Sequence, residues 1–314
     1  MIDVVYACND AYVRQTLVSM VSLTEHNQDA NIYLMYDGLS IENRRMMLQI
    51  LERYHQTITF LDMKEWVPEW KLDEEDRHPR TIYAKLFMEQ AIPSDRVLYL
   101  DSDVIVTDSL EPLFGRNMEH ECVAGVLMPY SSKLKQRIHG FPGEPYICDG
   151  VVLFNMKLWK STEKTKQCLE YIRKQQGKPP MLSEGTLNHV CRGEIGVLEP
   201  KYNQMPSMLM YPLEQLRQLF RVDFYYQDET IMEQAVKKPI LIHFMNELYN
   251  RPWFAPCDHP WRNLFRKRYE ELFGEQVYEV QDISLHTKVT RLLYRFLPFE
   301  VYKILYQLKQ MLKR

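Results

Sequence analysis

Apolar and polar positions follow a repeating order along the first hundred residues. Short runs rich in β-branched and aromatic residues predict three strands, at residues 3–8, 31–37 and 57–63. Between these runs, residues 11–27 and 40–56 carry apolar side chains at helical spacing, and Ser40 stands at the expected N-cap of the second helix. Successive strands joined by helices indicate parallel pairing, so the sequence predicts a doubly wound α/β sheet.

The same alternation continues through the rest of the chain. Further strands are predicted at residues 97–100, where the strand ends in two aspartates, and at 121–128 and 238–245. Residues 147–160 are predicted to form a strand that leads into a helix. A helix is predicted at 80–92, where Pro93 ends it. Another is predicted at 181–191, with Ser183 as its N-cap.

Composition and charge restrict the class of protein. A hydrophobic fraction of 46% over 314 residues supports a sizeable core, and a net charge of −3 argues against nucleic acid as a partner. The six cysteines form no CxxC pair, which excludes a zinc ribbon and indicates reduced thiols in a cytoplasmic protein. The N-terminus lacks the features of a signal peptide, and no apolar run approaches the ~18–20 residues of a spanning helix.

The last thirty residues differ from the rest in charge. Residues 285–314 hold seven Lys or Arg and one acid, Glu300, and Pro298 is expected to separate two helices. The second helix has an apolar stripe, formed by Val301, Ile304, Leu305, Leu308, Met311 and Leu312. Basic amphipathic helices lie in membrane interfaces. We therefore expect a domain at 1–280 and a tail at 281–314 that attaches the protein peripherally to the anionic inner face of the plasma membrane. The alternative is a solvated helix packed on its own domain or on a partner.

Two aspartates, Asp101 and Asp103, interrupt the apolar run at 97–106. Side chains alternate along a strand, so both carboxylates are expected on one face and Ser102 on the other. Two carboxylates form half a site for a hard divalent cation, and His243, at the end of a late strand, is the candidate third ligand. This ligand set suits Mn²⁺, with Mg²⁺ as the alternative. The competing interpretation is a pair of solvated aspartates and an ordinary core histidine.

Five segments in order carry a resemblance to a known family. They are VVYACNDAY, TIYAKL, VLYLDSDVIV with SLEPLF, YICDGVVLFNMKLWK and HFMNELYNRPW, spread over about residues 3–253. In this order they resemble glycosyltransferase family 8, which includes bacterial lipopolysaccharide galactosyl- and glucosyltransferases and glycogenin. The resemblance implies a GT-A fold and manganese-dependent transfer of a hexose, with retention, from UDP-glucose or UDP-galactose. It also implies a bacterial surface glycan or glycolipid as acceptor.

The resemblance also implies roles for individual residues. Asp101, Asp103 and His243 match the family's metal ligands, and Asp101 also approaches the ribose. The residues matched to donor binding are Ala7, Asn9, Tyr12, Lys85, Asp101, Ser102 and Arg251. Lys85 stands where the family commonly has Arg, and Arg251 lies two residues farther from His243 than the corresponding Lys.

The catalytic assignments fall on Glu184 and Asp149. Asp149 replaces a frequent Asn that binds the donor sugar or acceptor, and Ser183-Glu184 replaces a common Asp-Gln. Glu184 is expected either to stabilise positive charge at the anomeric carbon or to act as nucleophile in a double displacement. Front-face transfer is the other route. The plain alternative is an ordinary helix start, with Ser183 as cap and Glu184 as a solvated acid.

Two other functions fit part of this pattern. The segment LDSDVIV also satisfies much of the haloacid-dehalogenase phosphatase signature, in which the first Asp is a nucleophile. However, a complete βαβαβ unit precedes it here, whereas that motif usually lies on the first strand. The second alternative is a non-catalytic, membrane-peripheral protein that only binds nucleotide or glycan.

Overall fold

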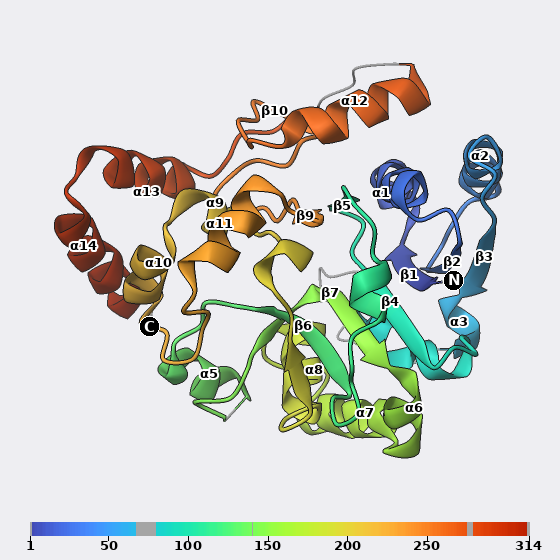
Figure 1. Cartoon of the computed structure of the whole chain (residues 1–314), viewed down its shortest axis with the longest axis horizontal. Coiled ribbons are helices and arrows are strands. Elements are labelled where there is room, and N and C mark those ends of the chain that lie inside the picture. Colours follow the sequence, from blue (N-terminus) through green and yellow to red (C-terminus); the bar gives the residue numbers. More distant parts are fainter. Residues whose placement is uncertain (1, 67–79, 140, 275–278, 313–314) are drawn as a thin grey trace.

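A seven-stranded sheet forms the centre of the protein (Figure 1). The computed structural model describes residues 2–66, 80–139, 141–274 and 279–312. The strand order is β3-β2-β1-β4-β7-β6-β8. The strands are β1 (Ile2–Cys8), β2 (Ala30–Tyr36), β3 (Ile58–Asp62), β4 (Arg96–Leu100), β6 (Val123–Leu127), β7 (Ile147–Asn155) and β8 (Ile195–Val197).

The pairing in this sheet is mixed. β1 pairs in parallel with β2 and β4, and β2 pairs in parallel with β3, as the alternating pattern predicts. β7 is antiparallel to both β4 and β6, while β8 is parallel to β6. Nearly every residue of β1, β4, β6 and β7 is buried, because helices cover both faces of the sheet. The predicted doubly wound α/β sheet is confirmed.

Helices from different parts of the chain cover the two faces (Figure 1). On one side lie the 3₁₀ helix η2 (Arg80–Gln90), α6 (Met156–Ser161), α7 (Lys164–Lys174) and α8 (Leu182–Val190), which pack on one another. On the other side lie α1 (Val13–His26) and α12 (Arg262–Phe273), with α2 (Ile41–Glu52) beside α1. The Ser40 hydroxyl accepts from the backbone N–H of Asn43, so the predicted N-cap of α2 is confirmed.

Short elements complete the described structure. They are η1 (Asp10–Tyr12), α3 (Met63–Trp66), α4 (Glu111–Phe114), α5 (Ser132–His139), η3 (Pro200–Tyr202), α9 (Pro206–Met210), α10 (Leu213–Phe220), α11 (Glu229–Lys237), β10 (Phe254–Ala255) and β11 (Glu279–Val280). A separate two-stranded sheet pairs β5 (Val104–Val106) with β9 (Leu241–His243). Among the described residues, no helix combines the length and apolar character needed to cross a bilayer.

The chain ends in two helices, α13 (Leu285–Phe296) and α14 (Phe299–Leu312), with Pro298 between them as predicted. They lie at the opposite end of the molecule from α2 (Figure 1). α14 packs against α10, and the hydroxyl of Tyr302 on α14 shares a hydrogen bond of 2.7 Å with that of Tyr211, which caps α9. The division into a domain at 1–280 and a tail at 281–314 stays a prediction.

Candidate functional site

The two aspartates of the DxD motif lie in a turn rather than along a strand. β4 ends at Leu100, β5 begins at Val104, and the Val104 N–H donates to the Asp101 carbonyl at 3.3 Å. The aspartates thus directly follow the carboxyl end of a buried strand, as predicted, and the chain then leaves the main sheet to join β9. The Ser102 hydroxyl donates to the Ala7 carbonyl at 3.2 Å, on the side away from the carboxylates, as expected.

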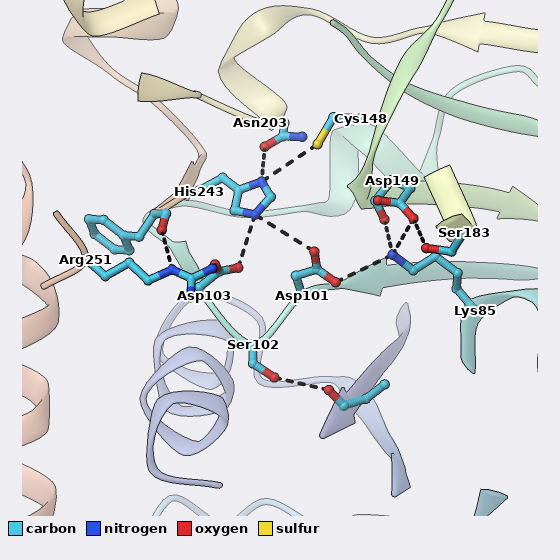
Figure 2. Close-up of polar contacts among 12 residues, drawn as sticks. Lys85, Asp101, Ser102, Asp103, Cys148, Asp149, Ser183, Asn203, His243 and Arg251 are labelled. Atoms are coloured by element: carbon cyan, nitrogen blue, oxygen red, sulfur yellow. Dashed lines mark hydrogen bonds and ion pairs between the residues drawn. The ribbon is translucent and has the colours of Figure 1, made fainter. Parts of the chain in front are cut away.

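His243 reaches the two aspartates through the small sheet. β5 and β9 are antiparallel with Val104 opposite His243, and the Phe244 N–H donates to the Asp103 carbonyl at 2.9 Å. The imidazole Nε2 lies 3.1 Å from Asp103 Oδ1 and 3.9 Å from Asp101 Oδ2 (Figure 2). Ligand atoms of all three residues lie within 4.8 Å of one another. The structure thus brings together the three predicted metal ligands from segments 140 residues apart.

Gly150 leaves the space in which these ligands meet. A Cβ at this position would lie 2.3 Å from His243 Cε1 and 2.7 Å from Asp101 Oδ2, which no side chain could occupy without displacing them. The Gly150 carbonyl also accepts from the Asp101 N–H at 2.8 Å. Two carboxylates and an imidazole around this clearance fit a divalent cation of the Mn²⁺ or Mg²⁺ class.

Two residues missed by the sequence analysis orient the imidazole. Asn203 Oδ1 lies 3.1 Å from His243 Nδ1, and Cys148 Sγ lies 3.9 Å from the same nitrogen. With its proton on Nδ1, the imidazole donates to Asn203 and turns the Nε2 lone pair towards the aspartates, an arrangement typical of metal-binding histidines. Asn203 follows the short helix η3, and no sequence pattern marks it. Cys148 precedes Asp149 in a quoted segment, but a lone buried cysteine gave no signal.

Ion pairs within the cluster shift the pKa values of Asp103 and His243 in opposite directions. Burial acts to raise the pKa of Asp103, but the charges of His243 and Arg251 outweigh it and hold that pKa well below its usual range. Burial acts to lower the pKa of His243, but Asp103 raises that pKa well above the ordinary value. Both shifts favour an ion pair between a protonated His243 and the Asp103 carboxylate.

Arg251 joins the DxD motif to the predicted nucleotide pocket. Its guanidinium donates to Asp103 Oδ2 at 3.1 Å and to the Tyr12 hydroxyl at 3.0 Å. The Tyr12 ring packs edge-on against Trp253, with the ring centroids 6.4 Å apart. The extra two residues of spacing from His243 are taken up by the loop, so Arg251 still reaches the cluster.

The residues predicted to bind the nucleotide meet at the end of β1. Ala7 lies on this strand next to Ser102, and Asn9 directly follows it, with its backbone carbonyl accepting from the Tyr12 N–H at 3.1 Å. Asn9 Oδ1 is buried and has no hydrogen-bond partner among the described residues. An unpaired buried carbonyl is costly, and a donor on a bound ligand would satisfy it.

Lys85 stands on the other side of Asp101. Its ammonium contacts Asp149 Oδ2 at 2.9 Å and Asp101 Oδ1 at 3.6 Å (Figure 2). It also lies 4.4 Å from the centroid of the Tyr99 ring. Burial acts to lower the pKa of Lys85, but the two aspartates outweigh it and raise that pKa. The buried, positively charged ammonium of Lys85 therefore lies between the three metal-ligand candidates and Asp149.

The whole of this site lies inside a segment that matches a known family. The model of glycosyl transferase family 8 matches residues 3–257. The chain belongs to this family. The matched range agrees with the 3–253 span over which the sequence resemblance was recognised. Membership of this family leaves the phosphatase alternative without support.

Curated glycosyltransferases that resemble the chain agree with this assignment. The glycosyltransferase GlyE of Streptococcus pneumoniae serotype 4 is 23% identical over 291 residues, covering 90% of this chain and 62% of GlyE. The lipopolysaccharide 1,2-glucosyltransferase of Escherichia coli K12 is 21% identical over 299 residues, covering 88% and 87%. The chain thus spans less than two thirds of GlyE.

The fold itself is similar to that of solved glycosyltransferases. The galactosyltransferase LgtC, solved with donor and acceptor sugar analogs, superposes with a TM-score of 0.68 at 21% identity, covering 87% of this chain and 96% of LgtC. The crystal structure of GlyE gives a TM-score of 0.63 at 20% identity, covering 90% and 66%. These likenesses show the GT-A fold, as predicted.

This family 8 chain departs from its expected pattern at the start of α8. The prediction of Ser183 as the N-cap was wrong. Met181 occupies that position, and no side chain caps the helix. The Ser183 hydroxyl donates to Asp149 Oδ2 at 2.5 Å instead, so it supports the acid that also pairs with Lys85.

Glu184 is not the solvated acid of the plain alternative. Its Oε1 is buried, with no hydrogen-bond partner among the described residues. Burial and then the charge of Asp149 raise the pKa of Glu184 well above its ordinary value, although hydrogen bonds from Tyr146 and the Asp149 backbone oppose this. The surroundings of Glu184 therefore favour the neutral form of its carboxyl group. The catalytic roles of Glu184 and Asp149 stay predictions.

Proposed function

We propose that this protein transfers a hexose, with retention, from UDP-glucose or UDP-galactose to a bacterial surface glycan or glycolipid such as lipopolysaccharide. The carrying observation is the convergence of Asp101, Asp103 and His243 around the clearance at Gly150, beside the buried, unpaired oxygen of Asn9. The Asp101, Asp103 and His243 cluster suits a divalent cation bound to a diphosphate. The Asn9 oxygen suits a nucleobase that donates a hydrogen bond.

The donor would lie along the carboxyl ends of β1 and β4, the usual ligand position in open α/β sheets. Asn9 would accept from the imide N–H of uracil, and the Tyr12 ring would pack against the base. Arg251 lies between Tyr12 and Asp103, so it is placed to bind the diphosphate between base and metal. The sugar would then extend towards Lys85, Asp149 and Glu184.

A divalent cation, Mn²⁺ with Mg²⁺ as the alternative, would be held by Asp101, Asp103 and His243 and would offset the negative charge that develops on the departing diphosphate. Arg251 and Lys85 add fixed positive charge on either side of the same position. The site therefore needs no proton donor for its leaving group.

The state of Glu184 favours front-face transfer. A nucleophile in a double displacement must be ionised and close to the anomeric carbon. Burial and Asp149 instead raise the pKa of Glu184, so the residue enters the reaction as a neutral acid able to donate a hydrogen bond to the sugar. Asp149, held by Lys85 and Ser183, supplies the neighbouring acceptor.

We also place the protein in the cytoplasm, attached peripherally to the inner face of the plasma membrane. The support is the basic tail, with seven cationic residues and one acid from 285 to 314. Glycolipid acceptors embedded in that leaflet would then lie within reach of the site.

The deciding experiment measures UDP release from a panel of nucleotide sugars in the presence of Mn²⁺. Asp103→Ala is expected to lower turnover by about 100-fold or more and to abolish metal-dependent UDP binding, because it removes a ligand and leaves His243 and Arg251 unpaired. The matched control is Asp108→Ala, an exposed aspartate five residues away that hydrogen-bonds only locally.

Two outcomes would contradict the proposal. Full activity of Asp103→Ala in the presence of a chelator would remove the metal from the mechanism. UDP binding without release from any sugar in the panel would instead indicate the non-catalytic nucleotide- or glycan-binding protein.

A further inference from the structure

Exposed apolar side chains gather on the two C-terminal helices. In the described part of the chain, thirteen large hydrophobic side chains are exposed, and eight of them lie within the 26 residues of α13 and α14. They are Leu285, Val289, Leu292 and Phe296 on α13, and Val301, Ile304, Leu305 and Leu308 on α14. Their spacing of three or four residues places them along one stripe of each helix.

These helices are held to the domain by their other side. Tyr302 is buried and hydrogen-bonds Tyr211, and the Tyr294 hydroxyl donates to Gln215 Oε1 at 2.7 Å. The Gln307 amide donates to the Gln218 carbonyl at 3.0 Å. Tyrosine hydroxyls and a glutamine amide therefore hold the helices to the domain, and the apolar stripes are left facing solvent.

A pocket of about 420 Å³ lies beside this apolar surface. It is formed between α9 and α13, and Tyr249, six residues after His243, lines it as well. Leu292 belongs both to the exposed stripe and to the pocket wall, so the two are continuous. The pocket thus connects the outward apolar surface with the loop that follows the metal-ligand cluster.

The charge of this pocket is positive. Lys288, Arg291 and Arg295 line it, and none of its lining residues is acidic. Lys288 pairs with Asp282, and Arg291 pairs with Asp258, while no carboxylate among the described residues pairs with Arg295. Lys288, Leu292 and Arg295 follow one another at helical spacing on the same face. A cationic pocket at the edge of an apolar surface is complementary to an anion that carries hydrocarbon.

We propose that the pocket between α9 and α13 binds the phosphate of an anionic phospholipid in a bilayer on which the α13–α14 stripe rests. This inference deepens the proposed membrane placement and rests on it. Arg295 supplies the uncompensated charge for the phosphate, and Leu292 with its neighbours on the stripe contacts the acyl region. The same contact would orient the protein, because Tyr249 joins the pocket to the loop after His243.

The test is binding of the full chain to vesicles of phosphatidylcholine with and without phosphatidylglycerol. Removing one positive charge near an anionic surface is expected to weaken binding about fivefold, and reversing it roughly 30-fold. Arg295→Ala and Arg295→Glu should show these losses, and Leu292→Asp should weaken binding to both vesicle types. The matched controls, Arg45→Glu and Leu48→Asp, alter exposed residues of α2 at the far end of the molecule (Figure 1) and should bind as the parent protein does.

Three results would overturn the proposal. The first is equal vesicle binding by the Arg295 variants and the parent, with an unchanged melting temperature. The second is equal loss in the α2 controls, which would indicate a diffuse charge effect. The third is competition by inorganic phosphate at the concentration of accessible lipid phosphate, which would assign the pocket to a soluble anion.

The readout separates this inference from the proposed activity. Arg295 lies outside the donor site, so Arg295→Glu should release UDP from the donor sugar at the parent rate in the absence of vesicles. Charge-selective vesicle binding by a protein that releases no UDP would leave the pocket assignment standing and refute the transferase. UDP release without vesicle binding would support the transferase and refute the assignment of the pocket to a phospholipid.

Discussion

Glu184 shows how a single residue can keep the hydrogen-bonding character of an amide while being an acid. Burial beside Asp149 raises its pKa, so its carboxyl holds a proton where the family commonly has Gln. A neutral carboxylic acid and a primary amide can both donate one hydrogen bond and accept another. The apparent departure from the family pattern is therefore small in chemical terms.

This state predicts how Glu184→Gln changes stability with pH. The folded protein retains a proton that the unfolded chain releases above its ordinary pKa of 4.5. The stability of the parent therefore falls as pH rises from that value towards the raised pKa. Relative to the parent, Glu184→Gln should become more stable as pH is raised from 5 to 8, by about 1–3 kcal/mol, measured by denaturant unfolding at each pH.

The control for this experiment is Glu170→Gln, an exposed acid on α7, which should show no such trend. Turnover of Glu184→Gln should stay within about tenfold of the parent if the neutral acid is the working form. A pH-independent stability difference together with a much larger loss of turnover would instead identify Glu184 as an ionised participant.

At the scale of elements, the site depends on how closely four strands approach one another. β7 passes so near the junction of β4 and β5 that Gly150 touches both Asp101 and His243. β9 joins β5 outside the main sheet and carries the imidazole into that junction. A strand that must leave space for its neighbours' side chains needs glycine at the point of contact.

Gly150→Ala should therefore disrupt the site more than the fold. The added methyl must displace the His243 imidazole or the Asp101 carboxylate, so Mn²⁺ affinity should fall by at least about tenfold and UDP release with it. The cost in unfolding free energy should be about 1–3 kcal/mol. Calorimetric metal titration and denaturant unfolding measure the two effects.

Gly115→Ala is the matched control, because a Cβ there would meet only ordinary contacts at 3.7 Å and the backbone φ is −75°. It should leave metal binding unchanged. Normal Mn²⁺ affinity in Gly150→Ala would show that the three ligands do not act as one cluster.

For the whole molecule, the metal-ligand cluster links distant parts of the chain. Asp103 comes from the middle of the sequence, while His243 and Arg251 come from a late segment, and Tyr12 comes from its start. In the metal-free protein these segments are held together by ion pairs and hydrogen bonds. A bound cation would replace the proton on His243 and cross-link the same segments.

Mn²⁺ should therefore raise the melting temperature, and more strongly at higher pH. Asp103 raises the pKa of His243 well above its ordinary value, and metal binding requires the neutral imidazole, so binding releases a proton. Without metal, the stability contributed by this ion pair is lost as pH rises through the raised pKa. At 100 times its dissociation constant, the metal should add about 2.7 kcal/mol.

Melting curves at pH 6, 7 and 8, with and without Mn²⁺, measure this coupling. Asp103→Ala should abolish the increment at every pH, while Asp108→Ala should retain it. A metal-induced increment that shrinks as pH rises would contradict the protonated His243–Asp103 pair.

Much of the fold followed from local pattern alone. The strands at β1, β2 and β3, their parallel order and the cap at Ser40 all follow from apolar periodicity and a short polar side chain, which act within a few residues. The ordered segments also identified the family and the three metal-ligand candidates. Such signals can be detected in the sequence alone because they depend on residues that are close together along the chain.

Tertiary structure decided which side chains became partners in the site and which side of the tail faces solvent, because these contacts involve residues that meet only after folding. The DxD motif turned out to be a turn between two sheets, and Ser183 bonded Asp149 instead of capping its helix. Asn203 became a partner of His243, and the tail placed its tyrosine rings inward and its apolar stripe outward. Each outcome is set by what lies opposite a side chain in space, which residue spacing along the chain does not encode.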